Sequence, residues 1–192
     1  MEFLRTIDYR LFSFINQSLQ NTLFDFVMPW LRDKYFWIPL YALLLVYVLW
    51  KFRYQSWIVI VMAVVTIVLT DQISASIIKP LVHRLRPCNN PELKASVHLL
   101  IGCGGGFSFV SSHAANHFGL ALFLIMLLKN NLRWIIPAAI TWAALVSFAQ
   151  VYVGVHFPAD VLAGSVLGCA IGFSTGRICT LILNKLQLKK KL

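Results

Sequence analysis

Charged side chains are scarce in this sequence, because aspartate, glutamate, lysine and arginine make up only 12% of its 192 residues and seven of them are acidic. Hydrophobic residues make up 59%, and the mean hydropathy is +0.74. A soluble domain carries about 25% charged residues, since its surface has to stay in contact with water. The scarcity of charge excludes an ordinary soluble domain and predicts an all-α integral membrane protein.

The sequence also lacks the features of a nucleic-acid-binding protein, of a P-loop and of a cleaved signal peptide. The net charge of +10 suggests nucleic acid, but the basic residues are scattered at the ends of apolar runs, without a basic helix or an aromatic platform for bases. We therefore expect no nucleic-acid partner and an anionic lipid bilayer instead. The glycines at 102 to 106 form no P-loop, because no Gly-Lys-Ser/Thr follows them. Polar residues after Arg10 and the lack of a small-residue cleavage site predict that the N-terminus is kept.

Long apolar runs organise the rest of the chain. A helix crosses the bilayer with roughly 20 apolar residues. Five runs are candidates for crossing: 35–50, 57–78, 111–128, 134–150 and 159–183. Residues 8–31 have apolar side chains at helical spacing on one face, which predicts one or two amphipathic helices in the interface, with a sixth span as the alternative. The prediction is a bundle of five to six transmembrane helices with amphipathic N-terminal helices.

The distribution of positive charge predicts how this bundle is oriented. We expect a single domain over 1–192, with an interfacial segment 1–34, a transmembrane core 35–183 and a basic cytoplasmic tail 184–192. The basic residues at the cytoplasmic end are Lys51, Arg53, Lys129, Arg133, Arg177 and the lysines of the tail. Those at the other end are Arg32, Lys34, Lys79, Arg84, Arg86 and Lys94, several of which belong to the site proposed below. The protein is thus expected to be multi-pass in the inner (plasma) membrane, with its site facing the periplasm or exterior.

Two cysteines lie in the long polar loop at the expected outer end. Cys88 and Cys103 would form a disulfide in an oxidising compartment and so tie this loop together. Two free loop cysteines are the alternative.

Polar clusters interrupt the apolar sequence near one end of the spans. His156 and Asp160 are four residues apart at the start of a predicted helix, so the carboxylate is expected to reach one ring nitrogen while the other points into a cavity. An ordinary surface pair is the alternative. Asp71 lies within the second span, where an acid is costly, so it is either a hydrogen-bonded helix contact or a support for the site.

Two basic residues and the N-terminus of a predicted helix complete the group of candidate site residues. Lys79 and Arg86 are two fixed positive charges at the end of a helix, although either one alone is explained by an interfacial position. Ser111 and Ser112 precede an apolar helical run, so one of them is expected to cap it, and His113 adds an imidazole. Cations, helix-end amides and two histidines are what phosphoryl transfer through a covalent enzyme intermediate requires.

These residues resemble the motifs of the type 2 phosphatidic acid phosphatase (PAP2) superfamily of membrane lipid phosphatases. The first motif of that family, K-x6-R-P, is complete, while the second, P-S-G-H, and the third, S-R-x5-H-x3-D, are matched in part. The matching residues are Lys79, Arg86, Pro87, Ser111, His113, His156 and Asp160. Val110 and Ser112 replace proline and glycine of the second motif, and Ala149 and Gln150 replace serine and arginine of the third. The order and spacing agree from residue 79 to residue 160.

The resemblance implies a role for each matching residue. His156 would be the nucleophile that forms a phosphohistidine, Asp160 would orient it, and His113 would be the general acid and then activate water. The phosphate oxygens would be held by Lys79, Arg86, Ser111 and Ser112. Gln150 would offer a neutral amide where an arginine is expected, and Arg84 is the residue that would compensate. No metal or other cofactor is implied.

The implied substrate is a membrane lipid phosphate or diphosphate. Undecaprenyl diphosphate, phosphatidylglycerophosphate, phosphatidic acid and lipid A phosphates are the candidates, hydrolysed at the outer face of the inner membrane. A lipid phosphotransferase and a non-catalytic protein that binds or transports lipid phosphates are the alternatives. The sequence indicates neither the lipid tail nor the oligomeric state.

Overall fold

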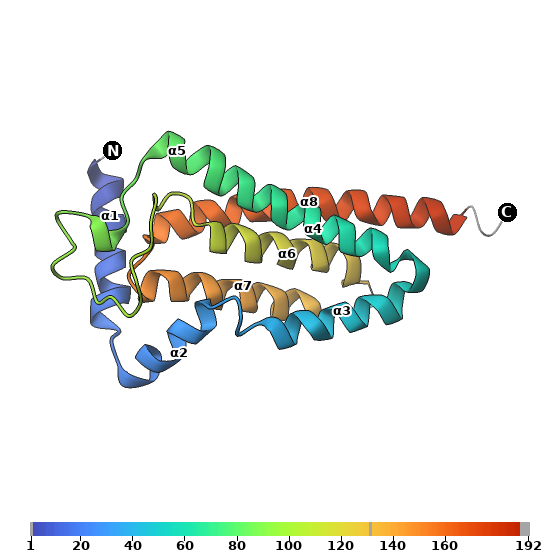
Figure 1. Cartoon of the computed structure of the whole chain (residues 1–192), viewed down its shortest axis with the longest axis horizontal. Coiled ribbons are helices and arrows are strands. Elements are labelled where there is room, and N and C mark those ends of the chain that lie inside the picture. The colour runs from blue at the N-terminus through green and yellow to red at the C-terminus, as the bar shows by residue number, and fades with distance from the viewer. Residues whose placement is uncertain (1, 131, 189–192) are drawn as a thin grey trace.

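The computed structural model describes residues 2–130 and 132–188, and every regular element in these ranges is helical. The α-helices are α1 (Glu2–Ser13), α2 (Thr22–Arg32), α3 (Ile38–Phe52), α4 (Ser56–Gln72), α5 (Lys79–Val82), α6 (Ser112–Leu128), α7 (Ile135–Tyr152) and α8 (Pro158–Leu188). Short π-helices (Phe14–Ser18, Ile73–Ile78) and 3₁₀ helices (Arg53–Gln55, Pro87–Asn89) join some of them. Helices α3, α4, α6, α7 and α8 run along one bundle, and α1 lies across its end (Figure 1).

Three helical stretches are long and apolar enough to cross a membrane: Ile38–Asn89, Ile135–Tyr152 and Pro158–Leu186. The first turns back on itself at Arg53, where φ is 49°, so that α3 and α4 run in opposite directions (Figure 1). Helix α6 is apolar but shorter, with 17 residues. The all-helical membrane fold is therefore confirmed, while the number of five or six crossings stays a prediction.

Several helix ends differ from those expected. The second apolar run continues as a π-helix and α5 up to Val82, so Lys79 lies within a helix and not at the start of a loop. Helix α8 extends to Leu188, so the predicted tail from residue 184 is helical in part, and residues 189–192 lie outside the described chain. Helix α6 begins as predicted, because the Ser111 hydroxyl accepts a hydrogen bond from the amide of Ala114 at 3.4 Å.

Glycines bring α8 into close contact with α6. Gly164, Gly168, Gly172 and Gly176 occur every fourth residue along α8 and therefore share one face. A Cβ atom at Gly172 would overlap the backbone carbonyl of Gly119 on α6. Lipid tails are as apolar as leucine, so membrane helices associate through close packing, which small residues allow. The sequence analysis missed this determinant, although the Gly-x3-Gly spacing is visible in the sequence.

The close contact between α6 and α8 brings the first turns of these two helices side by side. The amide of Ser111, which caps α6, donates a hydrogen bond to the carbonyl oxygen of Asp160 in the first turn of α8, at 2.9 Å. The residues around Ser111 and those around Asp160 are thus joined by a backbone hydrogen bond.

The N-terminal helices and the polar loop cover this end of the bundle (Figure 1). Asn16, in the π-helix after α1, is fully buried. Its amide donates to the carbonyl oxygens of His98 at 2.8 Å and Tyr152 at 2.7 Å, and its side-chain oxygen accepts from the amide of His98 at 2.9 Å. The loop also contains the expected disulfide between Cys88 and Cys103, whose Cα atoms are 5.9 Å apart. Polar residues of the N-terminal segment therefore hold the loop over the bundle.

The glycine contact generates a stability prediction. Gly172→Ala places a methyl group against the Gly119 carbonyl, so we expect it to destabilise the protein by about 1–3 kcal/mol, as overpacking does. Gly105→Ala is the matched control, because nothing lies within 4 Å of the added Cβ. Thermal unfolding of both variants in the same detergent measures the difference. Equal melting temperatures for Gly172→Ala and Gly105→Ala would show that the α6–α8 contact tolerates a side chain.

Candidate active site

The end of α7 positions His156. Gly154 adopts a left-handed conformation with φ of 87°, which glycine tolerates without strain. The amide of Val155 donates to the carbonyl of Gln150 at 3.3 Å, and that of Gly154 to the carbonyl of Val151 at 3.1 Å, which together form a Schellman C-cap. The amide of His156 also donates to the Gln150 carbonyl, at 3.3 Å. The cap thus fixes His156 directly beyond the last turn of α7.

The start of α8 positions Asp160. Its Oδ2 atom reaches back to accept a hydrogen bond from the amide of Phe157 at 2.8 Å, as the third residue of a capping box does, and Pro158 occupies the first helical position. The same oxygen lies 3.6 Å from Nδ1 of His156. Catalytic hydrogen bonds often tighten to normal length only when substrate is bound. The pair predicted on one helical face is therefore a contact from loop to helix, because α8 begins after His156.

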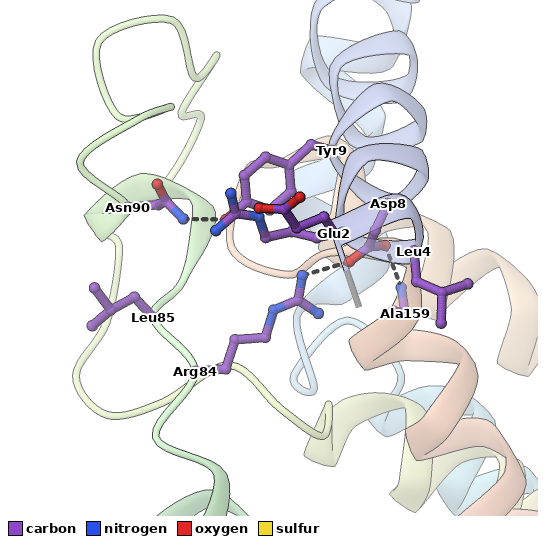
Figure 2. A pocket seen from close by; sticks show the side chains of 9 residues that line it. Glu2, Leu4, Asp8, Tyr9, Arg84, Leu85, Asn90 and Ala159 are labelled. Atoms are coloured by element: carbon purple, nitrogen blue, oxygen red, sulfur yellow. Dashed lines mark hydrogen bonds and ion pairs between the residues drawn. The ribbon is translucent and has the colours of Figure 1, made fainter.

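Arg84 and Asp8 hold the other side of the Asp160 carboxylate. Nη1 of Arg84 donates to Oδ1 of Asp160 at 2.7 Å, and Nη2 donates to Asp8 on α1. Asp8 also accepts from the amide of Ala159 at 2.8 Å (Figure 2). The guanidinium lies 4.1 Å from the ring centre of Phe157. Arg84 therefore orients Asp160 and is fully engaged there, whereas the sequence analysis expected it to compensate for Gln150.

Asp8 was missed as a residue near the site. Its carboxylate is almost fully buried, and it is one of only seven acidic residues in the chain. A carboxylate in a mostly apolar sequence needs a polar partner, and this was the available signal. Asp8, Arg84 and Ala159 also line a cavity of about 530 Å³ at the surface, beside α1 (Figure 2).

The surroundings of His156 keep its imidazole neutral. Burial lowers the pKa of His156, and although Asp160 raises it, the charges of Arg86 and Lys79 lower it further. A neutral ring whose Nδ1 hydrogen points to the carboxylate of Asp160 has a free lone pair on Nε2. This is the form of histidine that acts as a nucleophile.

Lys79 and Arg86 bring positive charge to the same place. The two residues interact electrostatically with each other and with Asp160. Nη2 of Arg86 donates to the carbonyl of Gly105 at 3.3 Å, while its buried Nε atom has no hydrogen-bond partner within 2–130 and 132–188. Part of the guanidinium is therefore available for an anion.

The first turn of α6 adds donors and a second imidazole. The hydroxyl of Ser111 accepts a hydrogen bond as the cap and so keeps its own hydrogen for donation. The hydroxyl of Ser112 accepts from Ser74 at 2.9 Å. His113 follows, within electrostatic range of Lys79 and His156. A helix N-terminus with these groups favours a bound anion.

A cavity of about 520 Å³ opens beside His113. Its lining residues are Lys34, Tyr41, Ile67, Asp71, Ser112, His113, Asn116, His117, Leu120 and Trp142. A second cavity of about 190 Å³, with an almost wholly apolar lining from α3, α4 and α6, shares Tyr41 and Leu120 with the first. The two neighbouring cavities differ in lining, since the first has polar residues beside His113 and the second is apolar, a combination that suits an amphiphile with a polar headgroup.

The wall of this cavity contains Asp71 and a histidine that the sequence analysis missed. Asp71 accepts a hydrogen bond from the amide of Asn116 at 3.4 Å and interacts electrostatically with Lys79. Nδ1 of His117 donates to the carbonyl of His113 at 2.8 Å, and its ring packs on Trp142 with centres 4.9 Å apart. The signal for His117 was its position four residues after His113, on the same helical face.

Gln150 lies in the last turn of α7, directly before the loop that contains His156. It is fully buried, and its Oε1 atom accepts a hydrogen bond from Nε of Arg32, the last residue of α2, at 3.4 Å. From the sequence, Arg32 was expected at this end of the molecule but not as part of the site.

The chain resembles several curated proteins over most of its length. It is 40% identical to the lipid A 4'-phosphatase of Bacteroides thetaiotaomicron over 172 residues, which cover 88% of this chain and 75% of the relative. It is 32% identical to the undecaprenyl-diphosphatase of Sulfolobus acidocaldarius, over 88% of this chain and 76% of the relative.

Solved structures and a family model agree with these relatives. The crystal structure of a PAP2-type phosphatidylglycerolphosphate phosphatase from Bacillus subtilis gives a TM-score of 0.66 over 98% of this chain and 88% of that one, at 20% identity, which shows a shared fold. The crystal structure of LpxE from Aquifex aeolicus gives a TM-score of 0.65 at 26% identity, over 88% of this chain and 94% of that one. The PAP2 superfamily model matches residues 55–183, a range that contains all three motifs. The chain therefore belongs to the PAP2 superfamily.

Proposed function

We propose that this membrane lipid phosphatase removes a phosphate monoester from a lipid A-type headgroup through a phosphohistidine at His156. The observation that carries the proposal is the meeting of the buried His156–Asp160 pair with Lys79, Arg86 and His113. His113 also lines a cavity that shares Tyr41 and Leu120 with a second, apolar cavity between the helices. The 40% identity to a lipid A 4'-phosphatase supports this choice of substrate.

The first step transfers the phosphoryl group to the enzyme. Nε2 of His156 attacks phosphorus, the new P–N bond forms, and the P–O bond to the lipid breaks. His113 donates a proton to the departing lipid oxygen, which therefore leaves as an alcohol. The position of His113 on the cavity wall supports this role, because the lipid would occupy that cavity. Asp160 stabilises the positive charge that develops on the ring of His156.

The second step releases phosphate. A water molecule attacks phosphorus and gives its proton to His113, while the P–N bond breaks and its electron pair returns to Nε2 of His156. Inorganic phosphate leaves, and His113 is protonated again for the next cycle. Lys79, Arg86 and the first-turn amides of α6 neutralise the phosphate oxygens in both steps. We propose that these protein charges make the reaction independent of metal.

Undecaprenyl diphosphate is the second candidate substrate, favoured by the 32% identity to an undecaprenyl-diphosphatase over 88% of this chain. The same residues would then cleave a P–O–P bond. A phosphotransferase would share the first step and pass the phosphoryl group to a lipid in place of water. A non-catalytic binding protein is disfavoured, because His113, His156 and Asp160 are all present.

A panel of lipids tests the proposed substrate. Purified protein should release phosphate from lipid A with a higher kcat/KM than from undecaprenyl diphosphate, phosphatidylglycerophosphate or phosphatidic acid, and EDTA should leave the rate unchanged. A labelled donor lipid, incubated with and without an acceptor lipid, separates hydrolysis from transfer. Phosphate release that requires an added metal ion, or that favours another lipid, would contradict the respective part of the proposal.

The two histidines should fail in different ways. His156→Ala should abolish both turnover and acid-labile phosphoprotein, because the nucleophile is lost. His113→Ala should slow turnover about 10²- to 10⁴-fold, the usual contribution of general acid-base catalysis. A lipid analogue with a good leaving group should rescue phosphoprotein formation in His113→Ala only.

A third histidine provides the control for this comparison. His83→Asn should keep wild-type activity, since His83 is exposed and asparagine tolerates its left-handed backbone. Acid-labile phosphoprotein that persists in His156→Ala would place the nucleophile elsewhere.

We also propose that the site faces the outer side of the inner membrane. Lys94 lies in the loop between α5 and α6, while Lys51 lies in the last turn of α3, which ends at the opposite end of the bundle (Figure 1). In a protein with Cys169 and Cys179 replaced by alanine, an impermeant thiol reagent outside intact cells should label Lys94→Cys and spare Lys51→Cys. Labelling of Lys51→Cys alone would reverse the orientation.

A further inference from the structure

Position 150 combines complete burial with an incomplete set of hydrogen bonds. The side chain of Gln150 has no exposed surface, and its Nε2 atom has no hydrogen-bond partner in the described part of the chain. An unpaired buried amide is costly, so the site is expected to supply a partner when it is occupied. Only the Oε1 atom is satisfied, by Nε of Arg32 at 3.4 Å.

The surroundings of Arg32 disfavour the positive charge of its guanidinium group. Burial lowers its pKa, the nearby charge of Arg86 lowers it further, and only Asp33 raises it. Residues 2–130 and 132–188 contain no carboxylate in an ion pair with Arg32. Arg32 also interacts electrostatically with His113. Two guanidinium groups therefore repel each other beside a histidine of the site, and neither forms an ion pair with a carboxylate in the described part of the chain.

Arg84, another cation beside the His156–Asp160 pair, is already engaged. Arg84 uses both terminal nitrogens on Asp160 and Asp8, and so cannot provide this charge. Arg32 is different, because the described structure gives its terminal nitrogens no hydrogen bond, while Nε is fixed by Gln150. A guanidinium held through Nε keeps its two terminal groups for a bidentate contact with phosphate oxygens.

We propose that Arg32 is a phosphate-binding residue of this enzyme and that Gln150 is the positioning residue that aims it. The charge that an arginine at position 150 would have provided comes instead from the end of α2. A neutral glutamine at position 150 is then required, because an arginine there would repel Arg32. The inference deepens the proposed function, since it adds a third cation to the same site.

Binding of inorganic phosphate to the purified, detergent-solubilised protein tests this inference without relying on turnover. Arg32→Gln should weaken phosphate binding about 10- to 100-fold, as expected for the loss of a charged hydrogen bond. Arg5→Gln is the matched control, because Arg5 is exposed on α1 and pairs with Glu92 at 3.9 Å. This control should bind phosphate as the wild type does, and melting temperatures should show that both variants are folded.

Moving the charge provides the decisive comparison. The double variant Arg32→Gln/Gln150→Arg returns one guanidinium to the site and should recover at least tenfold of the lost phosphate affinity. If Arg32 only held α2 against α7, Arg32→Gln would lower the melting temperature while the Kd for phosphate stayed at the wild-type value. That result, or a wild-type protein that binds no phosphate, would overturn the inference.

Turnover then separates this inference from the proposed function. If wild-type protein binds phosphate but hydrolyses no lipid, the proposed reaction fails while the role of Arg32 is still decided by the binding data. Where lipid is hydrolysed, Arg32→Gln should lower kcat/KM about 10²- to 10³-fold, the usual effect of removing one group that stabilises developing charge. An unchanged kcat/KM in Arg32→Gln would contradict the inference.

Discussion

The contact between α6 and α8 is the constraint on which the site depends. Four glycines allow the two backbones to approach so closely that a single added methyl group would overlap a carbonyl. This proximity lets the amide that precedes α6 donate to the carbonyl of Asp160. In the proposed reaction, this proximity is what would let His113 and the His156–Asp160 pair act on one phosphorus atom. In a bilayer, close packing of this kind has to drive helix association, because the hydrophobic effect does not favour it there as it does in water.

The assembled site contains more positive charge than its surroundings balance. Asp160 is shared between His156 and Arg84, and none of the cations Lys79, Arg86 and Arg32 forms an ion pair within residues 2–130 and 132–188. Such an arrangement costs stability in the empty protein and is favourable when a phosphate group is bound. The histidine within it is kept neutral by the same burial, which lowers its pKa. Under the proposed function, the same burial would therefore prepare both the positive charge and the nucleophile for a phosphate ester.

Much of this could be predicted from the sequence, because the relevant signals are local. The apolar runs, the Ser111 cap and the order of the motifs all follow from neighbouring residues, and the family match agrees with them. The role of Arg84 could not be found in this way, since its partners Asp8 and Asp160 are 76 residues away in either direction. The same holds for Arg32 and Gln150, which are 118 residues apart. Pairing across such distances is set by tertiary packing, which leaves no local pattern.

The N-terminal segment acquires a chemical role from these long-range pairs. The family model matches from residue 55 onward, so Asp8 and Arg32 both precede the matched range. Asp8 reaches Asp160 through Arg84, and Arg32 reaches the His156 loop through Gln150. Helices α1 and α2 therefore do more than cover the end of the bundle, because each contributes a charged group that is linked by hydrogen bonds to the residues around His156. In the proposed reaction, the three motifs would therefore depend on this segment being folded over the site.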